Sequence, residues 1–236
     1  MKYLLILLYF LPLLAQAQEA EETTYRYAVN VAKRLELELK HASTINIKSH
    51  SGNELIVKAK VLINDGQANK AFTVSQEQSG DIFRIVTILD MELAKQEVAK
   101  GTPCNCPDGS NWSFSKKEGK SYNVCLKVDI EVLLPKGKTI SLNTISADIT
   151  ANDIEGDIKL KSISGFIDLT WPKNAGGKVK LKSVTGELYT NLELSNRNKA
   201  EEFAIVGYEI EGEILGSKME QNIALETVSS NIYLRQ

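Results

Sequence analysis

The sequence predicts an all-β fold: a β-solenoid, or flattened β-helix, with coils of about 18–21 residues and an antiparallel β-hairpin region in the N-terminal half. The main observation is a sequence motif, I-x-G-x-I-x-L, that begins at Ile154 and again at Ile163. Variants of it recur through the C-terminal half, nine residues apart within each cluster, and begin at Ile145, Ala175, Val184, Ile210, Met219 and Val228. A fixed short period with alternating apolar residues is typical of strand-repeat architectures.

The N-terminus, residues 1–17, is expected to be a secretory signal peptide. Lys2 supplies a basic start, an apolar run extends from Leu4 to Leu14, and Ala15-Gln-Ala17 forms a small-x-small cleavage site. The apolar run is too short to span a bilayer, and no cysteine follows the cleavage site to form a lipobox. We therefore expect an exported protein, periplasmic or at the cell surface or extracellular, with no transmembrane segment in its mature chain.

The mature chain, residues 18–236, is expected to form a single β-strand-repeat domain. Its prolines and glycines are spread along the sequence, so no low-complexity linker divides it. The full chain carries 28 basic and 30 acidic residues. This balance argues against nucleic-acid binding, which needs clustered Lys and Arg.

The N-terminal part of the domain, residues 18–136, is expected to contain short strands. Alternating patterns indicate strands at 25–31, 35–39, 45–47 and 55–63, and residues 71–78 and 82–89 are expected to pair as a hairpin. Residues 91–122 are expected to form a short helix and then a long exposed loop. A strictly alternating strand at 124–135 leads into the repeat coils, residues 137–236.

Three cysteines, Cys104, Cys106 and Cys125, are disulfide candidates. In an oxidising compartment the expected bridge joins Cys125 to Cys104 or to Cys106. Closing that loop would contribute about 3 kcal/mol to stability. The alternatives are a free or intermolecular thiol and a Cys-x-Cys metal or redox site, although the latter lacks a fourth ligand nearby in the sequence.

Four copies of the repeat align column by column. The inward apolar columns begin with Ile140, Ile158, Val179 and Ile223, followed by Leu142, Leu160, Leu181 and Leu225. A hydroxyl column comes next: Thr144, Ser162, Ser183 and Thr227. The residues immediately after it are apolar again, with no intervening polar residue: Ile145, Ile163, Val184 and Val228. This break in the alternation predicts a corner, and the small residues that follow suit a tight one: Ala147, Gly165, Gly186 and Ser230.

The outward columns offer the candidate binding face. Four aromatic residues could form a hydroxyl-rich surface that stacks on sugar rings: Phe166, Trp171, Tyr189 and Tyr233. The alternative is an ordinary solvated sheet face, because Thr, Tyr and Phe are good strand residues. Trp112, with Phe114 in the 91–122 loop, is a further candidate for contact with a partner, unless both side chains fold back onto the sheet.

The sequence shows no catalytic pattern. Neither histidine lies in a Ser/Cys-His motif, and there is no H-E-x-x-H motif and no phosphate-binding loop. Asp148, Asp157 and Asp168 fall at different repeat phases, so they do not stack into an acidic site. We therefore expect a protein that is not an enzyme and that needs no metal and no cofactor.

Several stretches resemble the bacterial putative-adhesin family of β-strand-repeat envelope proteins, a domain of unknown function related to the head-GIN auto-transporter-like adhesins. They are Val128-Asp-Ile-Glu-Val-Leu-Leu-Pro-Lys-Gly137, Thr144 to Ile149, Ser162 to Ile167, and the opening Ile45 to Val57. The ending, Ile223 to Arg235, is similar to the family's, in which Asn-Gly commonly stands in place of Ser229-Ser230. Leu215-Gly-Ser-Lys-Met219 stands where the family often has a glycine-rich turn. The resemblance covers most of the mature chain and implies an exported β-solenoid.

The combined expectation is a non-enzymatic exported β-repeat protein that serves as an envelope scaffold or adhesion module. A glycan- or ligand-binding or sensing envelope module is the alternative. The expected partner is an envelope protein or a glycan.

Overall fold

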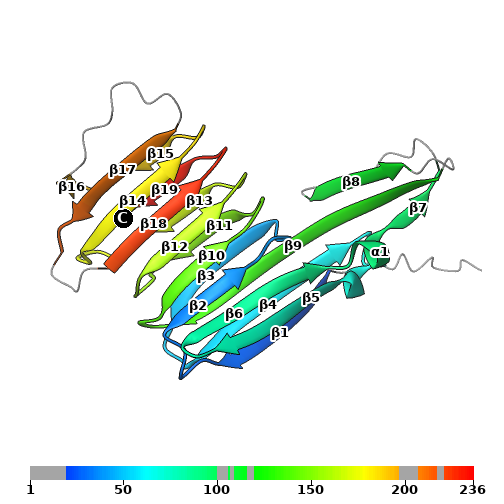
Figure 1. Cartoon of the computed structure of the whole chain (residues 1–236), viewed down its shortest axis with the longest axis horizontal. Helices are drawn as coiled ribbons and strands as arrows, with labels where there is room; N and C mark the ends of the chain where they lie inside the picture. The colour runs from blue at the N-terminus through cyan, green and yellow to red at the C-terminus, as the bar shows by residue number, and fades with distance from the viewer. Residues whose placement is uncertain (1–19, 100–105, 107–108, 116–119, 197–206, 217–220) are drawn as a thin grey trace, which may run out of the picture.

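The computed structural model describes residues 20–99, 106, 109–115, 120–196, 207–216 and 221–236. The expected signal peptide, Cys104 and Met219 therefore lie outside the described residues. Within the described part the fold is all-β, in two sheets that each contain parallel and antiparallel pairs (Figure 1). No helix in these ranges is long and apolar enough to cross a membrane.

Sheet A has the strand order β1-β4-β9-β3-β11-β13-β19-β15, with β7 and β8 also paired to β9. The strands of its N-terminal half are β1 (Glu21–Ala28), β3 (Thr44–His50), β4 (Glu54–Ile63), β7 (Gln96–Val98), β8 (Ser110–Ser115) and β9 (Ser121–Pro135). Those of its C-terminal half are β11 (Asp148–Asn152), β13 (Ile167–Thr170), β15 (Leu188–Thr190) and β19 (Ile232–Arg235).

Sheet B has the strand order β16-β17-β14-β18-β12-β10-β2-β6-β5. Its strands are β2 (Arg34–Glu38), β5 (Phe72–Ser79), β6 (Ile82–Leu89), β10 (Thr139–Asn143), β12 (Ile158–Ser162), β14 (Gly177–Ser183), β16 (Leu194–Ser195), β17 (Tyr208–Ile214) and β18 (Gln221–Thr227). Two short helices precede β5 and β7: the 3-10 helix η1 (Asn69–Ala71) and α1 (Met91–Ala94). Buried side chains from both sheets form one hydrophobic core.

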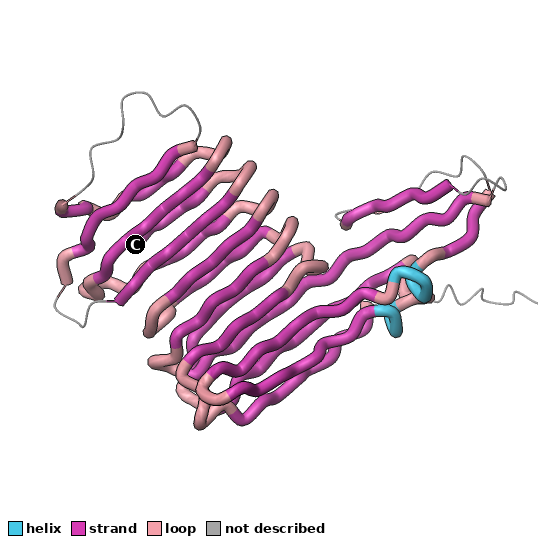
Figure 2. The backbone as a smooth tube through the Cα atoms, in the orientation of Figure 1, coloured by secondary structure: helices cyan, strands magenta, loops and turns pink. Residues whose placement is uncertain are grey.

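The chain alternates between the sheets in two-strand units, each a strand of sheet B followed by a strand of sheet A (Figure 2). These units are β2–β3, β10–β11, β12–β13, β14–β15 and β18–β19, and neighbouring units pair in parallel. Ile158 pairs with Ile140 on one side and with Ile223 on the other, and Val179 pairs with Ile223. The predicted inward column is therefore confirmed, and all four of its members are buried.

The units do not stack in chain order. In both sheets the last unit, β18–β19, lies between β12–β13 and β14–β15. The charge pattern on the outer face of sheet B favours this order. If β14 lay directly beside β12, the lysine rows of the two strands (159 and 161; 178, 180 and 182) would face each other at close range. The inserted β18 separates them, and its Glu226 carboxylate lies 3.0 Å from the Lys161 ammonium.

The segment that begins at Ile210 was expected to form a further coil, but it lies in β17, which runs antiparallel to β14. A row of glutamates on β17 faces the lysine row of β14. Lys180 Nζ lies 2.9 Å from Glu209 Oε1 and 2.6 Å from Glu211 Oε1. This pairing places a strand of opposite charge beside β14.

The hydroxyl column holds the corners together. Thr144, Ser162, Ser183 and Thr227 are all buried. The Ser162 hydroxyl donates to the Ala147 carbonyl at 3.2 Å and accepts from the Gly165 N–H at 2.9 Å. Ser183 makes the same pair of bonds, with the Ser230 carbonyl and the Gly186 N–H, at 3.0 and 2.9 Å. The hydroxyls therefore satisfy backbone groups that a buried turn would otherwise leave unpaired.

The N-terminal half contains the predicted hairpin and two strands, β7 and β8, in the segment that was predicted as helix and loop. β5 and β6 pair antiparallel from Phe72↔Leu89 to Ser79↔Ile82, which confirms the hairpin. The expected long loop is partly strand, because β8 pairs with β9 from Ser110↔Leu126 to Ser115↔Ser121. The expected short helix is α1, Met91–Ala94.

A disulfide joins Cys106 to Cys125, 19 positions apart in sequence, which selects one of the two predicted pairings. The alternation of β9 is confirmed, with Val124 and Leu126 buried and Cys125 between them less so. Asn64 supports this region: its side-chain oxygen accepts from the Cys125 N–H at 2.8 Å, and its amide donates to the Ala94 carbonyl at 2.6 Å.

Candidate functional site

Three aromatic residues gather on the outer face of sheet A near its C-terminal end: Phe166, Tyr233 and Tyr189, which we call the aromatic cluster. Phe166 precedes β13, Tyr233 lies in β19 and Tyr189 in β15, so the insertion of β18–β19 places Tyr233 between the other two strands. The rings of Tyr189 and Tyr233 stack with centroids 5.1 Å apart and an interplanar angle of 5°. Phe166 meets Tyr233 edge to face at 6.3 Å.

Polar groups fix the positions of these rings. The Tyr189 hydroxyl donates to the Glu187 carboxylate, and this carboxylate raises the pKa of the Tyr189 phenol above its ordinary value. Asn231 Nδ2 donates to the Tyr233 hydroxyl at 3.2 Å, and Asn231 Oδ1 accepts from the Glu187 N–H at 2.9 Å. Both phenols therefore have a partner on the protein, which orients them.

A second polar pair lies beside the cluster. Arg235 donates through Nε to Asp168 Oδ1 at 2.8 Å and through a terminal nitrogen to Asp168 Oδ2, as a two-pronged ion pair between β19 and β13. The Asp168 side chain is 13% exposed, whereas the Arg235 side chain is 55% exposed. The pair positions a planar cation at the border of the cluster.

The stacking limits what the aromatic cluster can bind. The apolar face of a sugar, or a flat aromatic group, stacks on the face of an aromatic side chain. Tyr189 already covers one face of Tyr233, and the edge of Phe166 approaches Tyr233 as well. Tyr189 is 44% exposed and lies in the last strand of sheet A. Its face turned away from Tyr233 is therefore the surface on which one further ring can stack.

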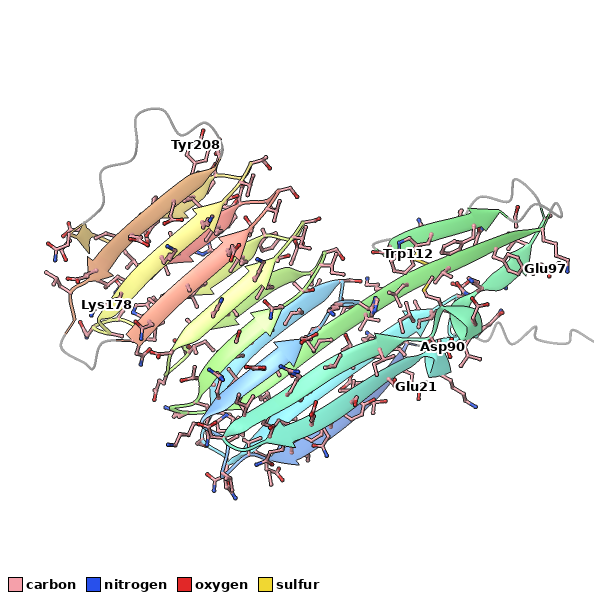
Figure 3. The ribbon with its side chains drawn as sticks, in the orientation of Figure 1. Glu21, Asp90, Glu97, Trp112, Lys178 and Tyr208 are labelled. Carbon is pink, nitrogen blue, oxygen red and sulfur yellow. A yellow bond between two sulfur atoms is a disulfide. The ribbon has the colours of Figure 1, made fainter. Side chains whose placement is uncertain are left out.

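Two of the predicted aromatic candidates lie elsewhere. Trp171 was expected on the outward face, but it is 1% exposed, and its indole N–H donates to the Ala175 carbonyl at 3.0 Å. It continues the inward alternation of Ile167 and Leu169, so it belongs to the core. Trp112 lies in β8, at the opposite end of the molecule from β15 and β19 (Figure 3), and packs partly buried against the core.

The residues at the predicted corner form a ridge, not part of the core. Ile145 and Ile163 are each 43% exposed, and Val184 and Val228 are half-buried. Their backbones are linked across the units, for example from the Ile163 N–H to the Ile145 carbonyl at 3.1 Å. The chain turns here, so the side chain after the buried hydroxyl points outward.

The N-terminal strands of sheet A carry paired charges on their outer face. Lys58 Nζ lies 2.7 Å and Lys48 Nζ 3.8 Å from the Glu131 carboxylate, and the hydrogen bond from Lys58 lowers the pKa of Glu131. Thr44 donates to Asp129 at 2.8 Å. A pocket of about 330 Å³ lies over β4 and β9, and its lining includes Lys58, Lys60, Asp129 and Glu131. Such a mixture of compensated charges is typical of a solvated sheet face.

The side chains that could bind a metal, including the histidines, form no common site in the described ranges. No group of three or more His, Cys, Asp or Glu side chains there could hold a metal ion. His50 Nδ1 accepts from the Gly52 N–H at 3.1 Å, and its Nε2 lies 2.7 Å from the Glu54 carbonyl. Burial lowers the pKa of the other histidine, His41.

Comparison with known proteins gives a similarity of fold. No protein-family model and no curated protein matches the chain. The chain is similar to the crystal structure of a putative cell adhesion protein from Clostridium sporogenes ATCC 15579, with a TM-score of 0.52 and 12% identity over 92% of this chain and 100% of that one. A putative adhesin from Bacteroides fragilis NCTC 9343 aligns over 91% of this chain and 97% of its own at 11% identity, with a TM-score of 0.21, so its fold is not shown to be the same.

Proposed function

We propose that this protein is an exported, non-enzymatic β-repeat protein that serves as an envelope scaffold or adhesion module. In this proposal the two-strand units are the coils of a flattened β-solenoid, and the mature chain acts in the periplasm or at the cell surface. The observation that carries the proposal is the stack of in-register parallel units, which presents two extended outer faces.

Two further observations support it. The Cys106–Cys125 bridge suits an oxidising compartment outside the cytoplasm. The similar fold occurs in a protein described as a putative cell adhesion protein. A rigid stack whose units contact only their neighbours offers an extended surface for a partner, as in other repeat proteins.

The alternative function is a glycan- or ligand-binding module, and one specific observation favours it. The outer face of Tyr189 is available at the end of sheet A, and the polar groups of Glu187 and Asn191 lie close to it in sequence. A single sugar ring could stack there with hydrogen bonds from these side chains. The site is narrower than the open aromatic face expected from the sequence.

A glycan array and an envelope-fraction pull-down with the mature chain, residues 18–236, test both functions. Tyr189→Ala is the test variant, and Tyr208→Ala, at a tyrosine that is 61% exposed on β17, is the matched control. An envelope protein captured by all three chains supports the scaffold or adhesion function. A glycan signal lost in Tyr189→Ala and kept in Tyr208→Ala supports the alternative, and turnover of an envelope substrate by the purified chain would contradict a non-enzymatic role.

A further inference from the structure

The edges of the two sheets differ in how well they are protected against pairing with another chain. Natural edges are blunted by charges, by short strands or by covering segments. Among the described strands, β7, β15 and β16 are two or three residues long. The longer edge strands carry charge: β1 has Glu21, Glu22 and Arg26, and β5 has Glu77.

Among the described residues, β8 carries no charge, is not short, and has no covering segment assigned to its outer edge. It has six residues, Ser110-Asn-Trp-Ser-Phe-Ser115, with no charged residue and no proline. It pairs with β9 along its whole length and with no other described strand. It also lies on the arm that projects from the main body of the molecule, formed by β7, β8 and the start of β9 (Figure 1). A partner strand could therefore approach its outer edge without meeting the stacked units.

The side chains of β8 favour a partner of the same sequence. Trp112 and Phe114 share one face of the strand, where they lie opposite Val124 and Tyr122 of β9. Phe114 is 36% exposed, and Lys95 Nζ lies 5.5 Å from the centre of its ring. Ser113 points to the other face, where its hydroxyl donates to Asn123 Oδ1 at 3.0 Å and the residue is exposed.

We propose that β8 pairs antiparallel with β8 of a second copy of this chain, about a two-fold axis at Ser113. An isologous interface requires a self-complementary surface, and this register supplies one. Trp112 lies opposite Phe114 of the second copy, and Phe114 opposite its Trp112, which gives two aromatic cross-strand pairs on one face. Ser113 lies opposite its own equivalent on the other face, and no like charges meet.

The association is reversible and weak. Five residues of edge in each copy, 111–115, and four aromatic side chains bury less than the roughly 1,000 Å² at which stable interfaces begin. The dimer therefore forms at the high local concentration of an envelope surface, and two copies on facing cells could join through their projecting arms. This inference deepens the proposed adhesion role and rests on that role for its biological setting.

Sedimentation of the mature chain over a range of concentrations tests the pairing. The chain carries Cys104→Ser, so that no intermolecular disulfide can form through that residue. Ser113→Glu and Ser113→Lys each place like charges across the two-fold axis, and each should weaken dimerisation about fivefold. An equimolar mixture of the two variants should dimerise again, because opposite charges then meet. Thr73→Glu, on the exposed side of β5, is the control and should dimerise as the parent does.

The mixture separates a true interface from a loss of local structure. If neither Ser113→Glu nor Ser113→Lys dimerises alone but the two variants dimerise when mixed, the register is supported. Two β8 strands that had lost their structure would not restore dimerisation to each other. A parent chain that stays monomeric at every concentration overturns the inference, as does a Ser113→Glu variant that dimerises like its parent. A monomeric parent that still captures its envelope partner would overturn the self-association and leave the proposed function intact.

Discussion

The substitution Gly165→Ala tests the packing of the corners. A Cβ atom at Gly165 would lie 1.8 Å from the Ala147 carbonyl oxygen, whereas real Cβ atoms essentially never lie closer than 3.0 Å to such an atom. The backbone would have to move by more than 1 Å. This movement occurs where the Ile163 and Ser164 N–H groups donate to the Ile145 carbonyl at 3.1 and 2.8 Å.

The expected cost of Gly165→Ala follows from these contacts. Overpacking in a rigid interior costs about 1–3 kcal/mol. Two weakened backbone hydrogen bonds add about 1 kcal/mol each. We therefore expect the free energy of unfolding to fall by about 3–5 kcal/mol.

Urea denaturation of the mature chain measures this loss, with the exposed Ser164→Ala at the same corner as the control. The free energy of unfolding of the control should lie within about 0.5 kcal/mol of that of the parent. If Gly165→Ala is as stable as Ser164→Ala, the units do not approach each other at the corner as described.

Three further predictions concern single interactions. Ser183→Ala removes a buried hydroxyl that bonds two backbone groups, so the free energy of unfolding should fall by about 2 kcal/mol, and an unchanged urea midpoint would contradict this role. Reduction of the Cys106–Cys125 bridge should lower it by about 3 kcal/mol, and thermal scans with and without reductant that coincide would show that the bridge is not formed. Glu131→Gln should cost less than about 1 kcal/mol at pH 7, because the pair with Lys58 is partly exposed. The pKa of Glu131 is lower in the folded state than in the unfolded state, so its stabilisation is present above the unfolded pKa and is lost as pH falls through the folded value. The parent and the variant should therefore converge in acid, and a difference that grows below pH 4 would contradict the assignment.

The register of the repeats could be predicted from the sequence because it depends on local alternation. A strand that slips by one residue turns its apolar side chains outward, so the aligned columns within the strands predicted which residues face inward and which meet across strands. The column after the hydroxyl residues was predicted wrongly, because the chain turns there and Ile145 and Ile163 are exposed. The pairing of Ile158 with Ile140 and Ile223 confirms this. The small residues at the corner were predicted for the same reason, and the space around Gly165 and Gly186 requires them.

The order of the units could not be predicted from the columns. Every copy presents the same inward pattern, so any two copies can be neighbours. The outward lysines on β12 and β14 were the available signal, because two such rows repel each other when adjacent. The same insertion brings Tyr233 against Tyr189. The aromatic cluster therefore depends on the spatial order of the units, which differs from their order in the sequence.

Two errors in the sequence analysis have simple physical causes. Trp171 was assigned to the outward face by residue type, although it has the same parity as the buried Ile167 and Leu169. The strand β8 was assigned to a loop because Ser and Asn dominate its composition. Its alternating Trp112 and Phe114 were the strand signal, and β9 supplies the partner that makes such a polar segment extended.

The central claim, that the last unit inserts between two earlier ones, is tested most directly by crosslinking between cysteines on the outer face of sheet B. In a Cys104→Ser background, Lys161→Cys is combined either with Glu226→Cys or with Lys182→Cys. Residues 161 and 226 are partners in adjacent strands, so their Cα atoms lie about 4.8 Å apart, within disulfide range. Residue 182 lies one strand further on, about 9.5 Å from residue 161. Our account predicts that mild oxidation links 161 to 226 and not to 182. A link between 161 and 182, with none to 226, would show that the units stack in chain order and would contradict the account.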